Sequence, residues 1–487
     1  MQIDLLGGSY QHRFRDWNSQ RTVNWLPKIA DQKEKNKTSV SLVPRPGLSS
    51  FANTNGESIR GLFTARTRTQ ERLFAVTGTS LLEILYDGSA SSIGTLTGMA
   101  TGSTSKVYMA LNGNGELMIQ DTLAAYIFNL NTNTLARVTD VDYPLGTTLD
   151  FADGYFLISG ADGRVYFSNL NDGATWSGLD FFTPTFKPDG VRAVVCNREE
   201  VYCFGDETIE IYINDGSTPF IRQSRTSLYY GITARDSVAV TQSGVFFLGK
   251  SATGGSAVYV MGADYSVTPV STPAISDRLN EFTNTDAEAF VQSTKDGHIL
   301  YHLHCPAMQT TMVYDVTTGL WHERQSKRPS ANADGSTDQD MYRGRNHVEF
   351  KGLSLYGDWY SGKIFKSDTS VKTDDGNVRM LKRSSPVFHS ERKYISVYNI
   401  ELDINAGFGT TSGQGVSPMM MFKCSLDGGN TFEKEEFIDL GALGHYDERV
   451  RINNLGTARD WVMSIEISDP VDIIIMQAEV HGAYGSH

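Results

Sequence analysis

The feature that most limits the fold is a two-strand unit that recurs seven times through the middle of the chain. The first strand of each unit is apolar, and the second carries an aromatic residue before a polar turn. These aromatic residues are Tyr86, Phe128, Phe167, Tyr212, Tyr259, Tyr314 and Phe365. A period of about 40–50 residues built from short strands is typical of a β-propeller, because each small sheet must bury its faces against its neighbours. The alternative is a pair of β-sandwiches whose strands share this spacing by coincidence.

The repeat predicts an all-β chain with a six- or seven-bladed β-propeller. Seven aromatic marks allow seven blades, but one mark could belong to a neighbouring domain, so six blades remain equally compatible. Abundant Tyr and Phe together with 46 glycines favour short strands joined by tight turns. Helical periodicity is nearly absent, and residues 286–293 are one of few short helical candidates.

The segments on either side of the repeat differ from it in composition. The first segment is polar, and Pro27, Pro44 and Pro46 interrupt it, so we expect an extended arm that becomes ordered against another protein. A polar insertion at 326–340 is expected to form a mobile loop at the propeller rim. Residues 371–393 are charged and linker-like. After them the alternation of apolar and polar residues that is typical of β-strands resumes. The predicted domains are an N-terminal arm at 1–55, a β-propeller at 56–370 and a C-terminal β-sandwich-like domain at 371–487.

The charge balance argues against a protein that grips nucleic acid. The 487 residues carry a net charge of −13. Residues 1–50 hold eight basic and four acidic side chains, so the remainder carries −17. A nucleic-acid-binding domain would usually be net basic. A local basic patch formed by Arg379, Lys382, Arg383, Arg392 and Lys393 keeps direct DNA contact open as an alternative.

Composition also predicts that the chain folds in the compartment where it is synthesised. No stretch approaches the roughly 20 apolar residues that span a bilayer, so no membrane insertion is expected. The first eight residues lack a basic region and an apolar core, which argues against a signal peptide. The four cysteines form no CxxC motif, and we expect them to be reduced and mostly buried.

No catalytic, cofactor-binding or metal-binding residue is assigned, and we expect no enzyme and no cofactor. His302 and His304 share one face of a strand and Cys305 points to the other, so the three do not make a metal site; we expect a half-exposed strand. The glycine-rich stretch at 407–415 has no following Lys-Ser/Thr and no helix, and is interpreted as a hairpin loop. The aspartates Asp334, Asp338 and Asp340 miss the spacing of a calcium loop and are interpreted as a solvated acidic loop.

One motif suggests a rival function. Residues 425–432 fit the Asp-box pattern S-x-D-x-G-x-T-aromatic, which is known from sialidase propellers, and residues 169–176 are a weaker copy. The motif predicts a structural hairpin, in which Asp427 caps the turn amides, glycine takes positive φ and Phe432 packs beneath. A glycan-binding or sialidase-like propeller remains the alternative. That chemistry would need three converging arginines, for which Arg192, Arg222 and Arg225 are available.

An ordered set of segments resembles the packaged-DNA stabilisation, or tail nozzle, family of short-tailed bacteriophages (podoviruses). An Asn/aromatic/Pro stretch is followed by a Pro-Gly-Leu motif, then by a G-x-x-T-I-E-like strand, a V-Y-x-x-G stretch and a G-D-x-x-S-G-K-I segment. These lie at residues 18–28, 43–51, 205–214, 258–279 and 356–365. Lys28 departs from the family pattern, and the C-terminal domain matches only through the hairpin at 425–432.

The resemblance implies a virion structural protein of the phage tail, assembled in the bacterial host cytoplasm. Such proteins form a ring, typically hexameric, below the portal and its adaptor. They extend the DNA channel, retain the packaged genome and allow its ejection. The implied partners are further copies of the chain, the portal adaptor, other tail proteins (fibre, tailspike or needle), and genomic DNA that passes without specific binding. The basic arm would dock on an acidic neighbour.

Overall fold

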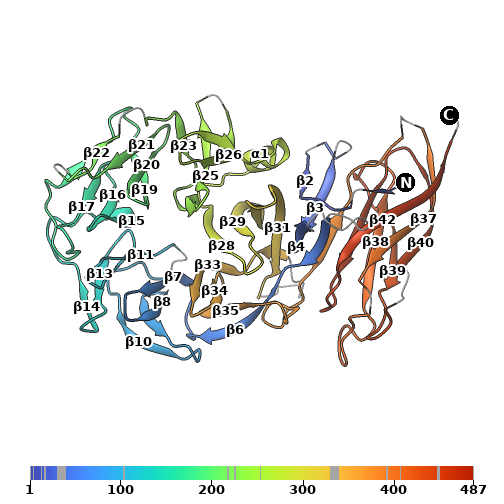
Figure 1. The fold of residues 1–487 in the computed structure, drawn as a ribbon, viewed down its shortest axis with the longest axis horizontal. Coiled ribbons are helices and arrows are strands. Elements are labelled where there is room, and N and C mark those ends of the chain that lie inside the picture. The colour runs from blue at the N-terminus through green and yellow to red at the C-terminus, as the bar shows by residue number, and fades with distance from the viewer. Residues whose placement is uncertain are drawn as a thin grey trace.

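The computed structural model describes a ring of small antiparallel sheets with a β-sandwich beside it (Figure 1). In Figure 1 the sandwich lies at one end of the long axis, and both chain termini lie on that side. The described residues are 2–3, 5–12, 14–15, 18–29, 40–102, 105–216, 219–223, 226–252, 254–329, 339–390, 393–405, 407–446 and 450–485.

Seven blades are present in the described part of the chain, which confirms the propeller and decides its blade number. The first three blades are β7 (Ile59–Arg66), β8 (Glu71–Thr77), β9 (Ser80–Ile84) and β10 (Ala90–Thr95); β11 (Tyr108–Leu111), β12 (Glu116–Gln120), β13 (Ala125–Asn129) and β14 (Thr134–Arg137); and β15 (Gly146–Ala152), β16 (Tyr155–Gly160), β17 (Val165–Phe167) and β18 (Phe181–Phe182). Blades 4 and 5 are β19 (Val191–Asn197), β20 (Glu200–Gly205), β21 (Ile209–Ile213) and β22 (Ile221–Arg222); and β23 (Tyr230–Ile232), β24 (Ala239–Thr241), β25 (Gly244–Ser251), β26 (Ser256–Met261) and β27 (Val267–Pro269). Blades 6 and 7 are β28 (Glu288–Ser293), β29 (Ile299–Cys305), β30 (Thr310–Asp315) and β31 (Leu320–Lys327); and β33 (Gly344–Phe350), β34 (Leu353–Asp358), β35 (Lys363–Asp368) and β6 (Gly47–Asn53).

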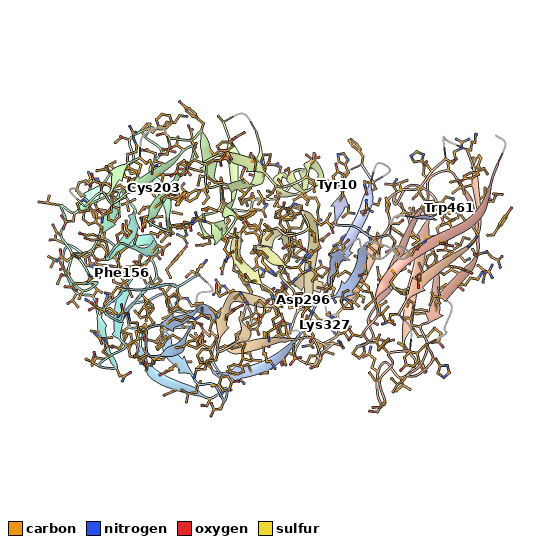
Figure 2. All side chains as sticks on the ribbon, in the orientation of Figure 1. Tyr10, Phe156, Cys203, Asp296, Lys327 and Trp461 are labelled. Atoms are coloured by element: carbon orange, nitrogen blue, oxygen red, sulfur yellow. The ribbon has the colours of Figure 1, made fainter. Side chains whose placement is uncertain are left out.

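The repeat in the sequence corresponds to the second and third strands of each blade. The apolar strands are the second strands, such as β8, β16 and β34. Six of the seven aromatics lie in third strands, and Tyr86 follows β9 by two residues. Apolar residues of both strands fill the space between neighbouring blades; Figure 2 places Phe156 in blade 3 and Cys203 in blade 4. These strands carry the signal because both of their faces are buried.

The last blade is closed by a strand from the N-terminal segment. β6 pairs antiparallel with β35, with Gly47 opposite Asp368 and Asn53 opposite Lys363. Leu48 on β6 is completely buried. The first blade begins directly after this strand, so the two ends of the propeller are held by one sheet.

The rest of the N-terminal segment joins the propeller to the sandwich. β3 (Ser19–Val23) pairs in parallel with β31 of blade 6 and antiparallel with β36 (Leu381–Ser384) of the sandwich. β4 (Trp25–Ile29) and β5 (Val40–Pro44) pair with each other, and β5 also pairs with β42 (Ile475–Tyr484). The expectation that this segment orders only on another protein is therefore wrong for these strands. The proposed domain bounds remain a prediction, although strand pairing crosses the bound at residue 55.

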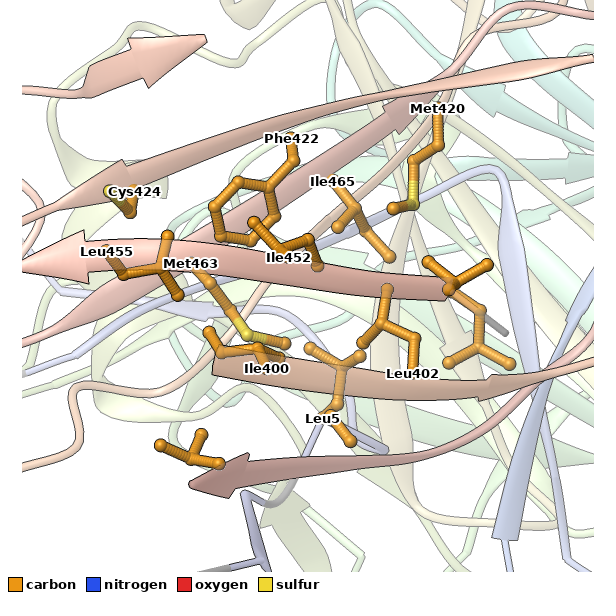
Figure 3. Close-up of a cluster of buried hydrophobic side chains, with 14 of the residues drawn as sticks. Leu5, Ile400, Leu402, Met420, Phe422, Cys424, Ile452, Leu455, Met463 and Ile465 are labelled. Carbon is orange, nitrogen blue, oxygen red and sulfur yellow. The ribbon is translucent and has the colours of Figure 1, made fainter. Parts of the chain in front are cut away.

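The sandwich consists of two sheets that enclose one apolar core (Figure 3). Phe422 and Ile465 contribute from one sheet, Ile400 and Ile452 from the other, and Leu5 enters from the N-terminal segment. Its further strands are β37 (Ile395–Ile404), β38 (Met419–Ser425), β39 (Glu433–Asp439), β40 (Val450–Ala458) and β41 (Val462–Ile467).

Two local predictions are wrong. Residues 288–293 form strand β28, because Ala289 and its neighbours pack across the inner edge of blade 6. The helix instead lies at α1 (Pro273–Asn280), where Thr272 caps the N-terminus and proline occupies the first turn. The linker-like stretch 371–393 contains β36, which pairs into the sandwich. Most of the polar insertion, residues 330–338, lies outside the described residues.

Candidate functional site

The first candidate site is the cavity along the propeller axis. It encloses about 750 Å³ and is lined by residues of the innermost strands and their loops. Its charged side chains are largely matched in pairs: Arg345 with Glu288 at 2.7 Å, and Arg192 with Asp206 at 3.0 Å. Trp359 covers the Arg345 guanidinium at 4.3 Å from the ring centroid. A cavity of this size is typical of small-molecule pockets and is far too small for a DNA duplex.

The second candidate is the joint between propeller and sandwich, which is built around buried arginines. Arg45 is 1% exposed, and its Nη1 donates to Asp374 Oδ1 at 2.9 Å. Its Nε donates to Asn24 Oδ1 at 2.8 Å. Asp374 also accepts from Ser326 at 2.8 Å. Burial alone would raise the pKa of Asp374, but Arg45 and Ser326 outweigh it and hold that pKa below its usual range.

A second ion cluster fixes β3 on blade 6. Glu323 is fully buried and accepts from Arg21 at 2.7 Å and from Arg278 at 3.3 Å. Burial would raise the pKa of Glu323, but the two arginines hold it well below its usual range. Arg278 lies on α1, so three separate segments of the chain meet at one carboxylate. A buried charge that loses such partners is strongly destabilising.

Three of the five cations of the predicted basic patch, Arg379, Lys382 and Arg383, belong to this joint. Arg383 is fully buried, and its guanidinium donates to Leu5 O at 2.7 Å and to Thr22 Oγ1 at 2.7 Å. Arg379 is 3% exposed and donates to Arg45 O, and Lys382 pairs with Glu466. Arg392 lies outside the described residues. Arg379, Lys382 and Arg383 stabilise the joint and do not offer a shared basic surface to DNA, whereas Lys393 is exposed.

The Asp-box hairpin is structural, as expected, with one correction. Asp427 accepts from the amides of Asn430 and Thr431 at 3.0 and 2.9 Å, and Gly428 and Gly429 have φ of 72° and 99°. Phe432, however, is 38% exposed and is not buried beneath the turn as predicted. The packing partner is instead Ser19 of β3, whose hydroxyl donates to Gly428 O at 3.0 Å. The hairpin is thus a docking point for the N-terminal strand.

Asp427→Ala is expected to lower the free energy of unfolding by about 1 kcal/mol, as for loss of a cap side chain. Partial burial opposes the shift, but hydrogen bonds from Ser425 and Thr431 lower the pKa of Asp427 to about 2. Its contribution should therefore be complete above about pH 4 and lost as the pH falls toward 2. Denaturant unfolding of the two proteins measures this. An unchanged unfolding midpoint would contradict the capping role.

The weaker copy of the Asp-box at 169–176 is also a turn. Its capping aspartate is Asp172, one residue after the motif position, which holds Asn171. Asp172 accepts from Ala174 N at 2.8 Å and from Thr175 Oγ1 at 2.7 Å. Trp176 is buried and its indole donates to Gly173 O at 2.9 Å. Here the aromatic residue does pack beneath the turn.

The arginines of the rival sialidase-like reading do not converge. Arg192 lies on the innermost strand of blade 4 and Arg222 on its outermost strand. Three strand spacings of about 4.8 Å separate them, and each pairs with a different carboxylate, Asp206 and Glu210. Arg225 lies outside the described residues. The geometry gives no carboxylate clamp from this pair.

The histidine strand of blade 6 is not half-exposed as predicted. His302, His304 and Cys305 are all completely buried, because blades 5 and 7 cover both faces of the sheet. Within the described residues, no three His, Cys, Asp or Glu side chains lie close enough to hold a metal ion. Asp340 is buried and pairs with Arg328, so it is not solvated as predicted, while Asp334 and Asp338 lie outside the described residues. The helices in the described part of the chain are too short or too polar to cross a bilayer.

Sequence reasoning missed the joint. Arg45 and Asp374 are 329 residues apart and Arg21 and Glu323 are 302 apart, so no local pattern relates them. The available signal was weak: Arg45 lies between two prolines in an otherwise apolar stretch.

Comparison with known proteins connects both domains to one family. A family model described as the β-propeller of bacteriophage P22 Gp10 matches residues 1–372, and one described as its β-sandwich matches residues 381–483. The tail hub protein gp10 of Salmonella phage P22 is 22% identical over 472 residues, covering 91% of this chain and 92% of that protein.

Two solved structures that resemble the chain do so only distantly. The extracellular domain of a one-component system from B. thetaiotaomicron has a TM-score of 0.44 at 11% identity over 83% of this chain, and the chain spans about half of its length, 47%. The N-terminal domain of Nup159 has a TM-score of 0.40 at 10% identity, over 70% of this chain and 98% of its own.

Proposed function

Because the chain belongs to the bacteriophage P22 Gp10 family and is thus a phage tail structural protein, we propose that it forms the nozzle of the tail. In this proposal six copies close into a ring below the portal and its adaptor. The ring continues the DNA channel, retains the packaged genome and lets it leave. The observation that carries the proposal is the match to a tail hub protein along nearly the whole chain.

The conduit for DNA would lie between copies of the chain and not through the propeller. The axial cavity of about 750 Å³ cannot admit a duplex. A contact between two different faces of neighbouring copies, repeated around an axis, closes into a ring. The lumen of such a ring is then lined by the outer surfaces of the domains.

The charge of the chain suits a channel wall that DNA must pass. A net charge of −13 disfavours phosphate contacts, because few cations are available to displace the counterions of the duplex. The arginines of the N-terminal segment that lie at the joint are occupied by Glu323 and Asp374, so they do not offset this.

Partner contacts would use the exposed apolar side chains of the propeller. Val141 is 97% exposed and Leu179 is 86% exposed; large exposed apolar groups often mark contact sites. Further copies, the portal adaptor and a fibre, tailspike or needle protein are the proposed partners. Assembly in the host cytoplasm fits four cysteines that are all free thiols.

The purified protein should bind duplex DNA only weakly near physiological salt, with a Kd above the roughly 10⁻⁴–10⁻⁶ M of non-specific DNA-binding proteins. Equilibrium binding to a labelled random duplex across a salt series measures this. Tight, sequence-independent binding would contradict a passive channel. It would indicate instead a protein that stabilises the packaged genome by holding it directly.

A further inference from the structure

One of the seven contacts between blades differs in chemistry from the others. Between the other neighbouring blades, clusters of nine to fourteen buried apolar residues fill the interface in the described structure. Between blades 6 and 7 the apolar cluster has five residues, and polar groups occupy much of the rest. We call this interface the histidine seam, after its residues Glu288, His302, His304, His322, Arg324, Arg345, His347 and Tyr356.

Two histidines of the seam are buried, and neither ring nitrogen of either one has a hydrogen-bond partner among the residues that the structure describes. His302 is 0% exposed and His322 is 1% exposed. They share one face of blade 6, since both lie opposite Val313 in the strand register. The His302 ring stacks on Phe290 at 4.4 Å between centroids. Buried imidazoles in such surroundings are held in the neutral form.

The other two histidines each have a carbonyl and a hydroxyl as hydrogen-bond partners, and burial, against the effect of the carbonyl, holds them in the neutral form. His304 Nε2 lies 3.0 Å from Gly344 O, and its Nδ1 lies 2.7 Å from Thr311 Oγ1. The carbonyl can only accept, so Nε2 carries the proton, and in the neutral ring Nδ1 accepts from the hydroxyl. His347 repeats the arrangement, with Nδ1 near Val291 O and Nε2 near Ser354 Oγ.

The fixed charges around the seam would repel a second positive charge. Arg324 is 3% exposed and forms no ion pair with a carboxylate in the described structure; its Nη1 donates to Gln292 at 3.4 Å. The carboxylates that face the seam or lie beside it already have partners. These pairs are Glu288 with Arg345, Asp315 with His298, Asp374 with Arg45 beyond Tyr342, and Glu323 on the opposite face of β31 with Arg21 and Arg278. Burial, followed by repulsion from Arg324, accordingly holds the pKa of His302 well below its usual range.

We propose that the histidine seam is an acid-sensitive closure of the propeller, at which protonation of the histidines parts blade 7 and its N-terminal closing strand from blade 6. Blade 7 is the blade completed by β6, so its release opens the ring of blades. The other blade interfaces contain mainly apolar side chains and keep their contacts. This inference does not depend on the proposed role in the tail.

The direction of the pH effect follows from the histidines. In an open or unfolded chain each takes up a proton near pH 6.5. In the closed seam burial lowers the pKa of His304 and His347 to about 4, and that of His322 to about 3. Closure is therefore most stable above about pH 6.5. Each histidine lowers the equilibrium constant for closure about tenfold for every pH unit below 6.5, down to its own pKa in the closed state.

Hydrogen exchange on the full-length protein between pH 7 and pH 4.5 tests the proposal, with protection factors corrected for the intrinsic pH dependence of exchange. Amides of β6 and β33–β35 should lose protection at a higher pH than those of β12, β13 and β16 in blades 2 and 3. Simultaneous loss in all blades, or earlier loss in another blade, would overturn the proposal.

A variant separates the histidines from other acid effects. His302→Phe combined with His322→Phe removes two titrating groups. The equilibrium constant for opening of blade 7 should therefore rise about a hundredfold less per pH unit of acidification than in the wild type. His481→Gln, in which the replaced side chain is 50% exposed, is the matched control and should behave as the wild type. If the double variant does not fold, His302→Gln alone is tested. In this variant the equilibrium constant for opening should rise about tenfold less per pH unit of acidification than in the wild type. An unchanged pH dependence in the folded variant would refute the seam.

Discussion

Replacing Asp374 with alanine is expected to lower the free energy of unfolding by about 3–5 kcal/mol. The substitution leaves the Arg45 guanidinium, which is 1% exposed, without its carboxylate. Arg45 also holds Asn24 on β3's connection to β4, so the loss should spread to the joint between propeller and sandwich. Urea unfolding at neutral pH, followed by tryptophan fluorescence, measures the change.

The control is to remove both charges at once. Arg45→Met with Asp374→Leu should recover much of the lost stability, because no unpaired charge then remains buried. The matched surface control is Asp296→Ala, which removes a pair between Lys28 and a side chain that is 55% exposed, and should cost less than about 1 kcal/mol. If Asp374→Ala were no more harmful than Asp296→Ala, the ion pair would not stabilise the joint.

Deleting residues 1–55 is expected to abolish cooperative folding of the whole chain. The deletion removes β6 from blade 7, β3 from between blade 6 and the sandwich, and Leu5 and Trp25 from the sandwich core. The orphaned charges Glu323, Arg383 and Asp374 would remain buried or force the joint apart. Calorimetry and near-ultraviolet circular dichroism should show no single sharp transition.

A shorter deletion distinguishes this effect from truncation in general. Removing residues 1–4 spares Leu5 and every strand from β2 (Tyr10–Gln11) onward, and should keep a cooperative transition. A truncation of residues 1–55 that folded cooperatively and differed only in assembly would show that the segment serves as an arm for partners. It would contradict the closing role that β6 has in the structure.

The sequence predicted the propeller because its signal is local. The second and third strands of each blade are buried on both faces, so apolar runs and aromatics such as Phe128 and Tyr314 repeat visibly along the chain. The family resemblance, drawn from segments in blades 4, 5 and 7 and the N-terminal segment, is confirmed by the match of both domains. The first and fourth strands carry weaker patterns, since they lie at the axis or at the rim.

The closure and the joint could not be predicted in the same way. Gly47 pairs directly with Asp368, although the whole propeller lies between them in the sequence. No local pattern relates the two residues, and the pairing is apparent only in the folded ring. The polar composition of residues 1–55 suggested an arm, yet two of its arginines, Arg21 and Arg45, bind buried carboxylates within the chain. In the Asp-box hairpin, the turn chemistry of Asp427 was predictable, whereas the docking of Ser19 of β3 at Gly428 joins residues too far apart in the sequence for a local pattern to relate them.

Electron microscopy of the isolated tail, at a resolution that separates subunits, tests the nozzle proposal most directly. We expect a closed ring of six copies coaxial with the portal adaptor, with a lumen wide enough for a duplex between the copies and none through the individual propellers. Each copy should show the sandwich joined to blade 6 through β3. A single copy at the periphery of the tail, or a ring without an axial lumen, would contradict it.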